Sequence, residues 1–167
     1  DTALGDLNDA IANYLHAIKI NPSFAKAHNN LANIQYNKGN FDAAEYHFTQ
    51  LIKNTSSLPY AHNSLGNTLR AKGDLIGAIN NYTQSIKIQP NLAETHNNMG
   101  TVLTLQGNRI AAIESYEKAI AIKPDYAGAH HNIGLALMGE SNLNSARKSI
   151  EHAISIDPNY VEVFQSY

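Results

Sequence analysis

The sequence has 167 residues, of which 43% are hydrophobic and 16% charged, and its formal net charge at pH 7 is −2. This balance is typical of a folded, soluble domain, and the near-neutral charge lacks the basic field that general nucleic-acid binding requires. The absence of cysteine excludes disulfides, thiolate nucleophiles and sulfur-ligated metals.

Membrane insertion is not expected from the hydrophobic pattern. No apolar run approaches the roughly 20 residues that cross a bilayer. The first residues, DTALGDLNDA, lack the basic and apolar regions of a signal peptide. The location in the cell therefore stays open, with the cytoplasm slightly favoured.

Taken in chain order, the apolar residues follow the 3.6-residue helical period in nine segments separated by turn residues. We expect helices near 8–20, 25–38, 41–54, 59–72, 75–88, 93–106, 109–122, 127–140 and 143–156. We expect no β-strand.

Four segments repeat one another, each beginning 34 residues after the last: AHNNLANIQYNKGNFDAAEYHF (27–48), AHNSLGNTLRAKGDLIGAINNY (61–82), THNNMGTVLTLQGNRIAAIESY (95–116) and AHHNIGLALMGESNLNSARKSI (129–150). Each first helix carries a small residue, namely Ala32, Gly66, Gly100 or Gly134. Each second helix carries another small residue and then a large one, the large ones being Phe48, Tyr82, Tyr116 and Ile150. Three inter-helix turns contain Gly39, Gly73 or Gly107.

This pattern resembles the tetratricopeptide repeat (TPR) over essentially the whole chain. The resemblance implies an all-α TPR solenoid, a right-handed superhelix of antiparallel helix pairs in which each repeat packs on its neighbours. It divides the chain as one array: a partial repeat (second helix) at 1–24, repeats at 25–58, 59–92, 93–126 and 127–160, and the start of a further repeat at 161–167.

Histidine recurs with the repeat, at His28, His62, His96 and His130, which raises the question of a metal site. Helices packed in sequence lie about 10 Å apart, whereas ligand nitrogens lie about 2 Å from a shared ion, so we interpret these side chains as packing residues. The sequence contains no P-loop, HExxH or GxSxG motif. We therefore expect no catalytic residue, no metal site and no cofactor, and the chain is not expected to be an enzyme by itself.

Asparagine recurs on one face of the first helices, and in the TPR family this face lines a concave groove. An asparagine in a helix costs about 0.5–0.7 kcal/mol relative to alanine, but its amide offers the donor and the acceptor that match a peptide bond. The series Asn30, Asn98 and Asn132 resembles the groove asparagines of O-linked N-acetylglucosamine transferases. General asparagine abundance and repeat duplication are the competing explanations. The candidate groove residues are Asn29, Asn30, Asn33, Asn63, Asn67, Asn97, Asn98 and Asn132, with Lys26, Tyr60 and Arg70.

The resemblance implies a protein–protein interaction scaffold that binds an extended peptide or a partner helix in the groove. The alternative is the substrate-recruiting TPR arm of a larger enzyme, such as a glycosyltransferase or sulfotransferase, whose catalytic domain lies outside this chain. A third hypothesis is self-association through uncapped ends. A chaperone-tail clamp is not expected, because the positions that would need lysine or arginine hold Asn29, Glu94 and Asn98.

Overall fold

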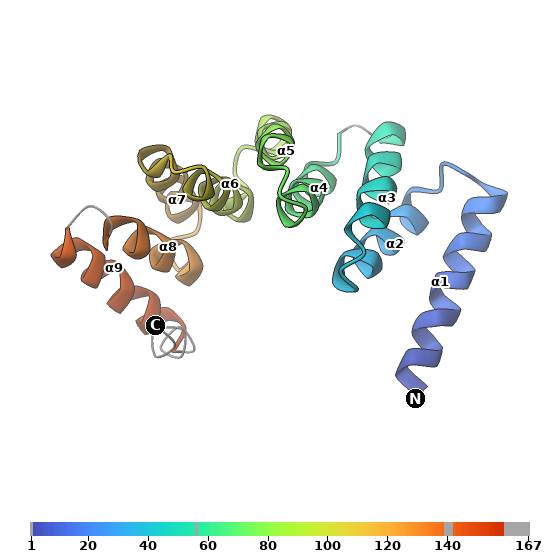
Figure 1. Cartoon of the computed structure of the whole chain (residues 1–167), viewed down its shortest axis with the longest axis horizontal. Helices are drawn as coiled ribbons and strands as arrows, with labels where there is room; N and C mark the ends of the chain where they lie inside the picture. The colour runs from blue at the N-terminus through green and yellow to red at the C-terminus, as the bar shows by residue number, and fades with distance from the viewer. Residues whose placement is uncertain (1, 56, 139–141, 159–167) are drawn as a thin grey trace. The chain divides into compact units, whose positions relative to one another are not determined.

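The computed structural model describes residues 2–55, 57–138 and 142–158, and within these ranges the chain forms nine α-helices and no strand (Figure 1). No helix in this described part is long and apolar enough to cross a membrane. The expected all-α class and the order of the helices are confirmed. The helices are α1 (Thr2–Ile20), α2 (Ala25–Asn37), α3 (Phe41–Asn54), α4 (Pro59–Ala71), α5 (Leu75–Ile88), α6 (Ala93–Leu105), α7 (Arg109–Ile122), α8 (Ala127–Met138) and α9 (Leu143–Ile156).

The helix boundaries differ from the expectation mainly at the start of the chain. Helix α1 begins at Thr2 rather than near residue 8, because no proline precedes Pro22 and Gly5 weakens a helix by only about 1 kcal/mol. The three turns that contain glycine are formed as expected. Gly39, Gly73 and Gly107 have φ of 76°, 85° and 77°, a backbone region in which side chains with a Cβ are strained. The expected start of a further repeat at 161–167 lies outside the described residues.

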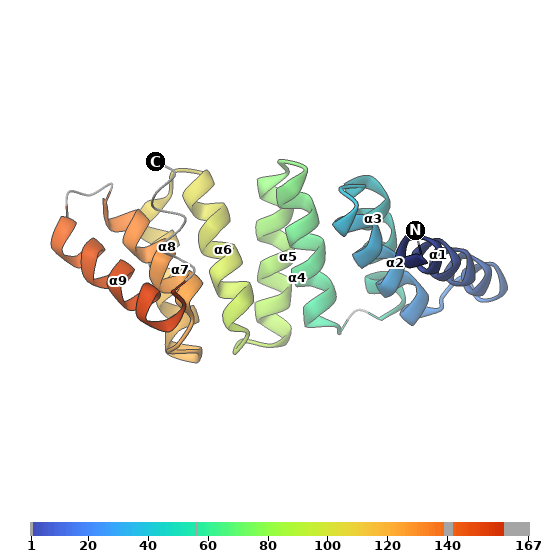
Figure 2. The ribbon, with the colours of Figure 1, turned by 90° about the horizontal axis from the view of Figure 1, so that it is seen from below.

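The chain divides into two compact units, Asp1–Ile88 and Gln89–Tyr167. In the first unit α1 packs on α2, α2 on α3, α3 on α4 and α4 on α5. In the second unit α6 packs on α7, α7 on α8 and α8 on α9, with a smaller contact between α6 and α8. Figure 2 shows α4 beside α5 as neighbouring rods of similar length. Within each unit, therefore, every helix covers the apolar face of the helix before it.

The core of each unit is built where a small residue of one helix meets a large residue of the next. A Cβ added to Gly66 would lie 2.5 Å from Cε1 of Tyr82, and one added to Gly100 would lie 2.5 Å from Cε1 of Tyr116. Both tyrosines are buried, with 0% and 2% of their surface exposed. These rings are core residues, and the glycines are required by the close approach of the two helices.

Three of the four recurring histidines join a first helix to the turn before it. The Nε2 atoms of His28, His96 and His130 lie 3.0, 2.8 and 2.8 Å from the carbonyl oxygens of Pro22, Pro90 and Pro124. Because a carbonyl can only accept, each Nε2 carries the hydrogen. No group of side chains that could hold a metal ion is found among the described residues. The histidines thus satisfy turn carbonyls that the proline-containing junctions leave without a helical partner.

Two other histidines, His47 and His131, are buried and have lowered pKa values. The Nδ1 atoms of His28 and His47 lie 3.1 Å apart between α2 and α3, and since His28 donates from Nε2, its Nδ1 accepts and His47 donates. Burial, assisted by the charge of His28, lowers the pKa of His47 below its ordinary value of 6.5. Burial alone lowers the pKa of His131. Both side chains are therefore neutral in the folded protein near neutral pH.

We expect the protein to lose stability as the pH falls below about 6.5, the pKa of an unperturbed histidine. Above that value His47 and His131 are neutral in both the folded and the unfolded chain, and their full contribution to stability is present. Below it the unfolded chain binds protons that the folded chain resists, so unfolding becomes more favourable until the pH has passed the lowered pKa values. Urea denaturation at about pH 8 and about pH 5.5 measures this difference.

A matched variant assigns the effect to His47. In the next repeat Asn81 stands at the equivalent position, and its Oδ1 accepts a hydrogen bond of 3.2 Å from Nδ1 of His62. The substitution His47→Asn places the same two residue types together, with the amide Nδ2 donating to Nδ1 of His28. It should reduce the pH dependence, leaving the part that comes from His131. The exposed control His16→Gln should change neither the free energy of unfolding nor its pH dependence. A pH dependence that is unaltered by His47→Asn would show that the pair is not its source.

Candidate peptide-binding groove

The first unit contains a cavity of about 180 Å³ where α2, α3 and α4 meet, here called the first cavity. Three of its side chains come from the end of α2, one from α3 and two from α4. Four of the six are amides or hydroxyls of Asn and Ser, which makes the lining polar. The lining residues are Asn33, Tyr36, Asn37, Phe48, Ser64 and Asn67.

The second unit contains a cavity of about 200 Å³ where α6, α7 and α8 meet, here called the second cavity. Several residues of the first cavity have an equivalent here, displaced by twice the 34-residue period: 33 corresponds to 101, 48 to 116 and 67 to 135. Two compact units therefore form a cavity at the same place in the repeat. The lining residues of the second cavity are Thr101, Thr104, Leu105, Arg109, Tyr116, Asn132, Leu135 and Ala136.

The structure brings three of the predicted groove residues to these cavities. Asn33 and Asn67 line the first cavity, and Asn132 lines the second. The other predicted residues line neither of the two. Among them Lys26 and Tyr60 are exposed and Arg70 is half-buried, and the remaining ones are Asn29, Asn30, Asn63, Asn97 and Asn98.

The asparagines that line the cavities use one half of each amide inside the protein. Asn33 donates from Nδ2 to the carbonyl oxygen of Asn29 at 2.9 Å, and Asn132 donates from Nδ2 to Oδ1 of Asn97 at 3.0 Å. Asn67 accepts at Oδ1 from the hydroxyl of Tyr82 at 2.7 Å. The other half of each of these amides makes no hydrogen bond to the described residues. An oriented amide with a free donor or acceptor is suited to binding a peptide backbone.

Other members of the predicted set are engaged within the fold. Asn30 donates from Nδ2 to the hydroxyl of Tyr14 at 2.8 Å, which links α2 to α1. Asn63 and Asn98 are only 4% and 9% exposed, and both interact with other groups of the chain. The series Asn30, Asn98 and Asn132 therefore contains one residue that faces a cavity and two that are occupied inside their unit. Its role in binding stays a prediction.

Sequence reasoning missed most of the residues that complete the cavities. Tyr36 and Asn37 stand three and four residues after Asn33, and Thr104 and Leu105 stand three and four after Thr101. Side chains at this spacing lie on the same helix face. Extending the predicted asparagine face by one turn towards the end of each first helix would have identified them.

The comparisons with known proteins agree with this architecture. A family model described as a TPR repeat matches residues 1–39, 66–107 and 100–139, and models described as tetratricopeptide repeats match residues 25–56 and 127–160. The chain belongs to the tetratricopeptide repeat family. No curated protein matches the sequence.

Solved TPR structures show the same fold at low sequence identity. The crystal structure of MamA is 24% identical, with a TM-score of 0.86, and the match covers 96% of this chain and 94% of MamA. YrrB, described as a TPR protein with an unusual peptide-binding site, is 20% identical, with a TM-score of 0.79 and coverage of 99% and 85%. A thermophilic TPR protein from Thermus thermophilus is 22% identical, with a TM-score of 0.76 and coverage of 99% and 91%. At these identities the likeness establishes the fold alone.

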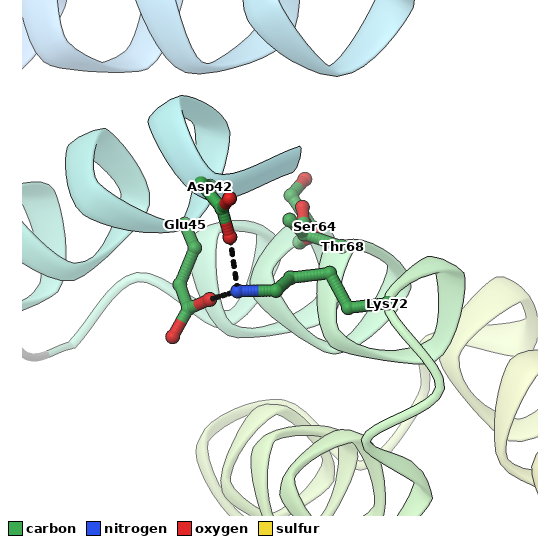
Figure 3. Close-up of polar contacts among 5 residues, drawn as sticks. All are labelled: Asp42, Glu45, Ser64, Thr68 and Lys72. Atoms are coloured by element: carbon green, nitrogen blue, oxygen red, sulfur yellow. Dashed lines mark hydrogen bonds and ion pairs between the residues drawn. The ribbon is translucent and has the colours of Figure 1, made fainter. Parts of the chain in front are cut away.

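A further hollow of this TPR chain lies beside the turn between α2 and α3. It has a volume of about 470 Å³, and Lys72 and Asp42 are among its lining residues. The Nζ atom of Lys72 lies 2.5 Å from Oδ1 of Asp42 and 2.6 Å from Oε2 of Glu45, so that the end of α4 is tied to α3 (Figure 3). Hydrogen bonds to Asp42 and then to Glu45 raise the pKa of Lys72. Because the lysine is already paired with two carboxylates, we interpret this hollow as a structural contact between repeats.

Proposed function

We propose that this chain is a protein–protein interaction scaffold that binds an extended peptide on the groove face of its first helices, without catalytic activity of its own. The proposal depends on the pair of equivalent cavities. Each contains an asparagine amide of which one half is hydrogen-bonded within the fold, while the other half makes no hydrogen bond to the described residues. The proposal treats 25–58, 59–92, 93–126 and 127–160 as its repeat units. The peptide-binding site named for YrrB supports this type of ligand for the fold.

The physical basis is backbone recognition by amides. An extended peptide presents a donor and an acceptor at every residue. At the rim of the first cavity, Asn33 and Asn37 have amide atoms that make no hydrogen bond to the part of the chain that the structure describes. Because those side chains are held by a helix, less conformational entropy is lost on binding than for side chains on a mobile loop. The contacts do not depend on the ligand's side chains, so this face can bind several sequences.

The test begins with a random-sequence peptide library displayed on phage and selected against the whole chain. A selected peptide is labelled, and its affinity is measured by fluorescence anisotropy. The double variant Asn33→Ala and Asn37→Ala should weaken binding roughly 5- to 100-fold, from about 0.5–1.5 kcal/mol for each lost hydrogen bond.

The matched control removes two asparagines elsewhere. Asn13 and Asn80 are exposed helical asparagines that line neither cavity, so Asn13→Ala with Asn80→Ala should leave the affinity unchanged. A library that yields no binder would contradict the proposal. Binders that respond equally to both double variants would also contradict it.

A further inference from the structure

The second cavity lacks an aromatic pair that is present beside the first. In the first unit Tyr36 and Phe41 pack edge to face, with ring centroids 5.6 Å apart. The equivalent residues of the second unit are Thr104 and Arg109, which both line the second cavity. A threonine is much smaller than a tyrosine, and the arginine places a charge where the first unit has a ring. The second cavity is therefore lined by a threonine and an arginine where the first unit has two aromatic rings.

The rim of the second cavity is apolar where that of the first is polar. Leu105 and Leu135, which are 61% and 47% exposed, occupy the places of Asn37 and Asn67. Covering exposed leucine surface with an apolar group stabilises a complex by about 25 cal/mol for each Å² removed from water. Two exposed leucines beside an unfilled space thus favour an apolar side chain of the ligand over a polar one.

Arg109 adds a charge that has no partner among the residues that the structure describes. Its guanidinium makes no ion pair or hydrogen bond with the described residues, in contrast to Lys72, which contacts two carboxylates. It is also the first residue of α7, where the helix dipole disfavours a cation by about 0.3–1 kcal/mol. The other repeats have the apolar residues Phe41, Leu75 and Leu143 at this position. A local conflict of this kind at the edge of a cavity is typical of a binding residue.

We propose that the second cavity is a subsite for a large aliphatic or aromatic side chain of a bound peptide, and that Arg109 binds the carboxylate of an aspartate or glutamate next to that side chain. This inference rests on the proposed function and adds the ligand's chemistry to it. The Oδ1 of Asn132, which makes no hydrogen bond to the described residues, accepts a backbone N–H of the same segment. Guanidinium and carboxylate can form two parallel hydrogen bonds, which gives the pair its specificity.

The probe is the synthetic peptide acetyl-Gly-Ser-Leu-Glu-Ser-Gly-amide, compared with one peptide in which Gln replaces Glu and another in which Ser replaces Leu. Each is titrated into the whole chain while the methyl signals of Leu105 and Leu135 are followed by NMR. The Leu-Glu peptide should shift these signals, and each replacement should weaken binding about tenfold, as expected for one charge-assisted hydrogen bond or one buried leucine.

Two substitutions test the assignment of the residues. Arg109→Gln should reduce the preference for the Glu peptide over the Gln peptide from about tenfold to about onefold, and the exposed Lys118→Gln on the same helix should leave it unchanged. Leu135→Asn introduces the residue found at Asn67 and should remove the preference for Leu over Ser. Equal losses in the Arg109 and Lys118 variants would show a general charge effect and overturn the proposal.

The outcomes separate this inference from the proposed function. If the Leu-Glu peptide fails to shift the Leu105 and Leu135 methyl signals, or binds no better than its Gln and Ser counterparts, the subsite is wrong. The scaffold function then still stands if library-selected peptides respond to the Asn33 and Asn37 double variant. If those peptides also ignore that variant, the proposed function fails as well.

Discussion

Gly66→Ala is expected to destabilise the protein by about 1–3 kcal/mol, as inserting a methyl group into a packed core generally does. The new Cβ would lie 2.5 Å from Cε1, 2.7 Å from Cδ1 and 3.0 Å from Cζ of Tyr82. The ring cannot turn aside freely, because it is fully buried and its hydroxyl donates to Oδ1 of Asn67 at 2.7 Å. Relief therefore requires a shift of α4 against α5. Urea denaturation followed by circular dichroism measures the loss.

A double-mutant cycle shows whether the ring's hydroxyl causes the strain. The first repeat has Ala32 and Phe48 at these two positions, both buried, so an alanine fits where the ring lacks a hydroxyl. Tyr82→Phe alone should cost about 0.5–1.5 kcal/mol for the lost hydrogen bond. In combination with Gly66→Ala it should cost less than the sum of the two single changes, since the released ring can move. Strictly additive costs would show that the backbones, rather than the tethered ring, set the close approach.

The helices and the core could be predicted because their causes are local and repeated. A small residue at Gly66 and a large one at Tyr82 recur at the same spacing in the next repeat, as Gly100 and Tyr116, and the packing they imply is the packing observed. The turns at Gly39 and its equivalents could also be predicted, because these turns need a residue with a positive φ. The start of α1 was predicted less well because no stop or start signal marks it.

The burial of each asparagine could not be predicted in the same way. Asn29 and Asn63 occupy the same position of successive repeats, yet Asn29 is half-buried whereas Asn63 is 4% exposed. The difference depends on how closely neighbouring helices cover each position, and this is not visible in a single repeat. A helical wheel gives the direction of a side chain, but it does not show whether another helix lies in that direction.

The residue types that line the second cavity could be predicted in part from the sequence. Aligning the repeats shows Arg109 in a column that otherwise contains Phe41, Leu75 and Leu143. Its significance depends on Thr104, which is five residues earlier in the chain and lines the same cavity. Only the three-dimensional structure shows that the two changed residues line one cavity and that their equivalents, Tyr36 and Phe41, are in aromatic contact.

The buried and the exposed asparagines should respond to alanine with opposite signs. Asn63→Ala should lower the free energy of unfolding by about 1–3 kcal/mol, because Asn63 is almost closed to solvent and the substitution removes its interaction with the rest of the chain. Asn33 is exposed, and its only hydrogen bond to a described residue runs to Asn29, one turn earlier in the same helix. Asn33→Ala should therefore leave stability unchanged or raise it by up to about 0.7 kcal/mol, the difference in helix propensity.

Urea denaturation of both variants at about pH 8 separates the two roles. Asn30→Ala should have an effect between these two. It removes the hydrogen bond from Asn30 to Tyr14 that joins α2 to α1, and it should lower the free energy of unfolding by about 0.5–1.5 kcal/mol. If Asn63→Ala proved neutral, the buried amide would not be a structural tie. A marked loss of stability in Asn33→Ala would mean that the rim of the first cavity holds the fold together and is not free to bind a peptide.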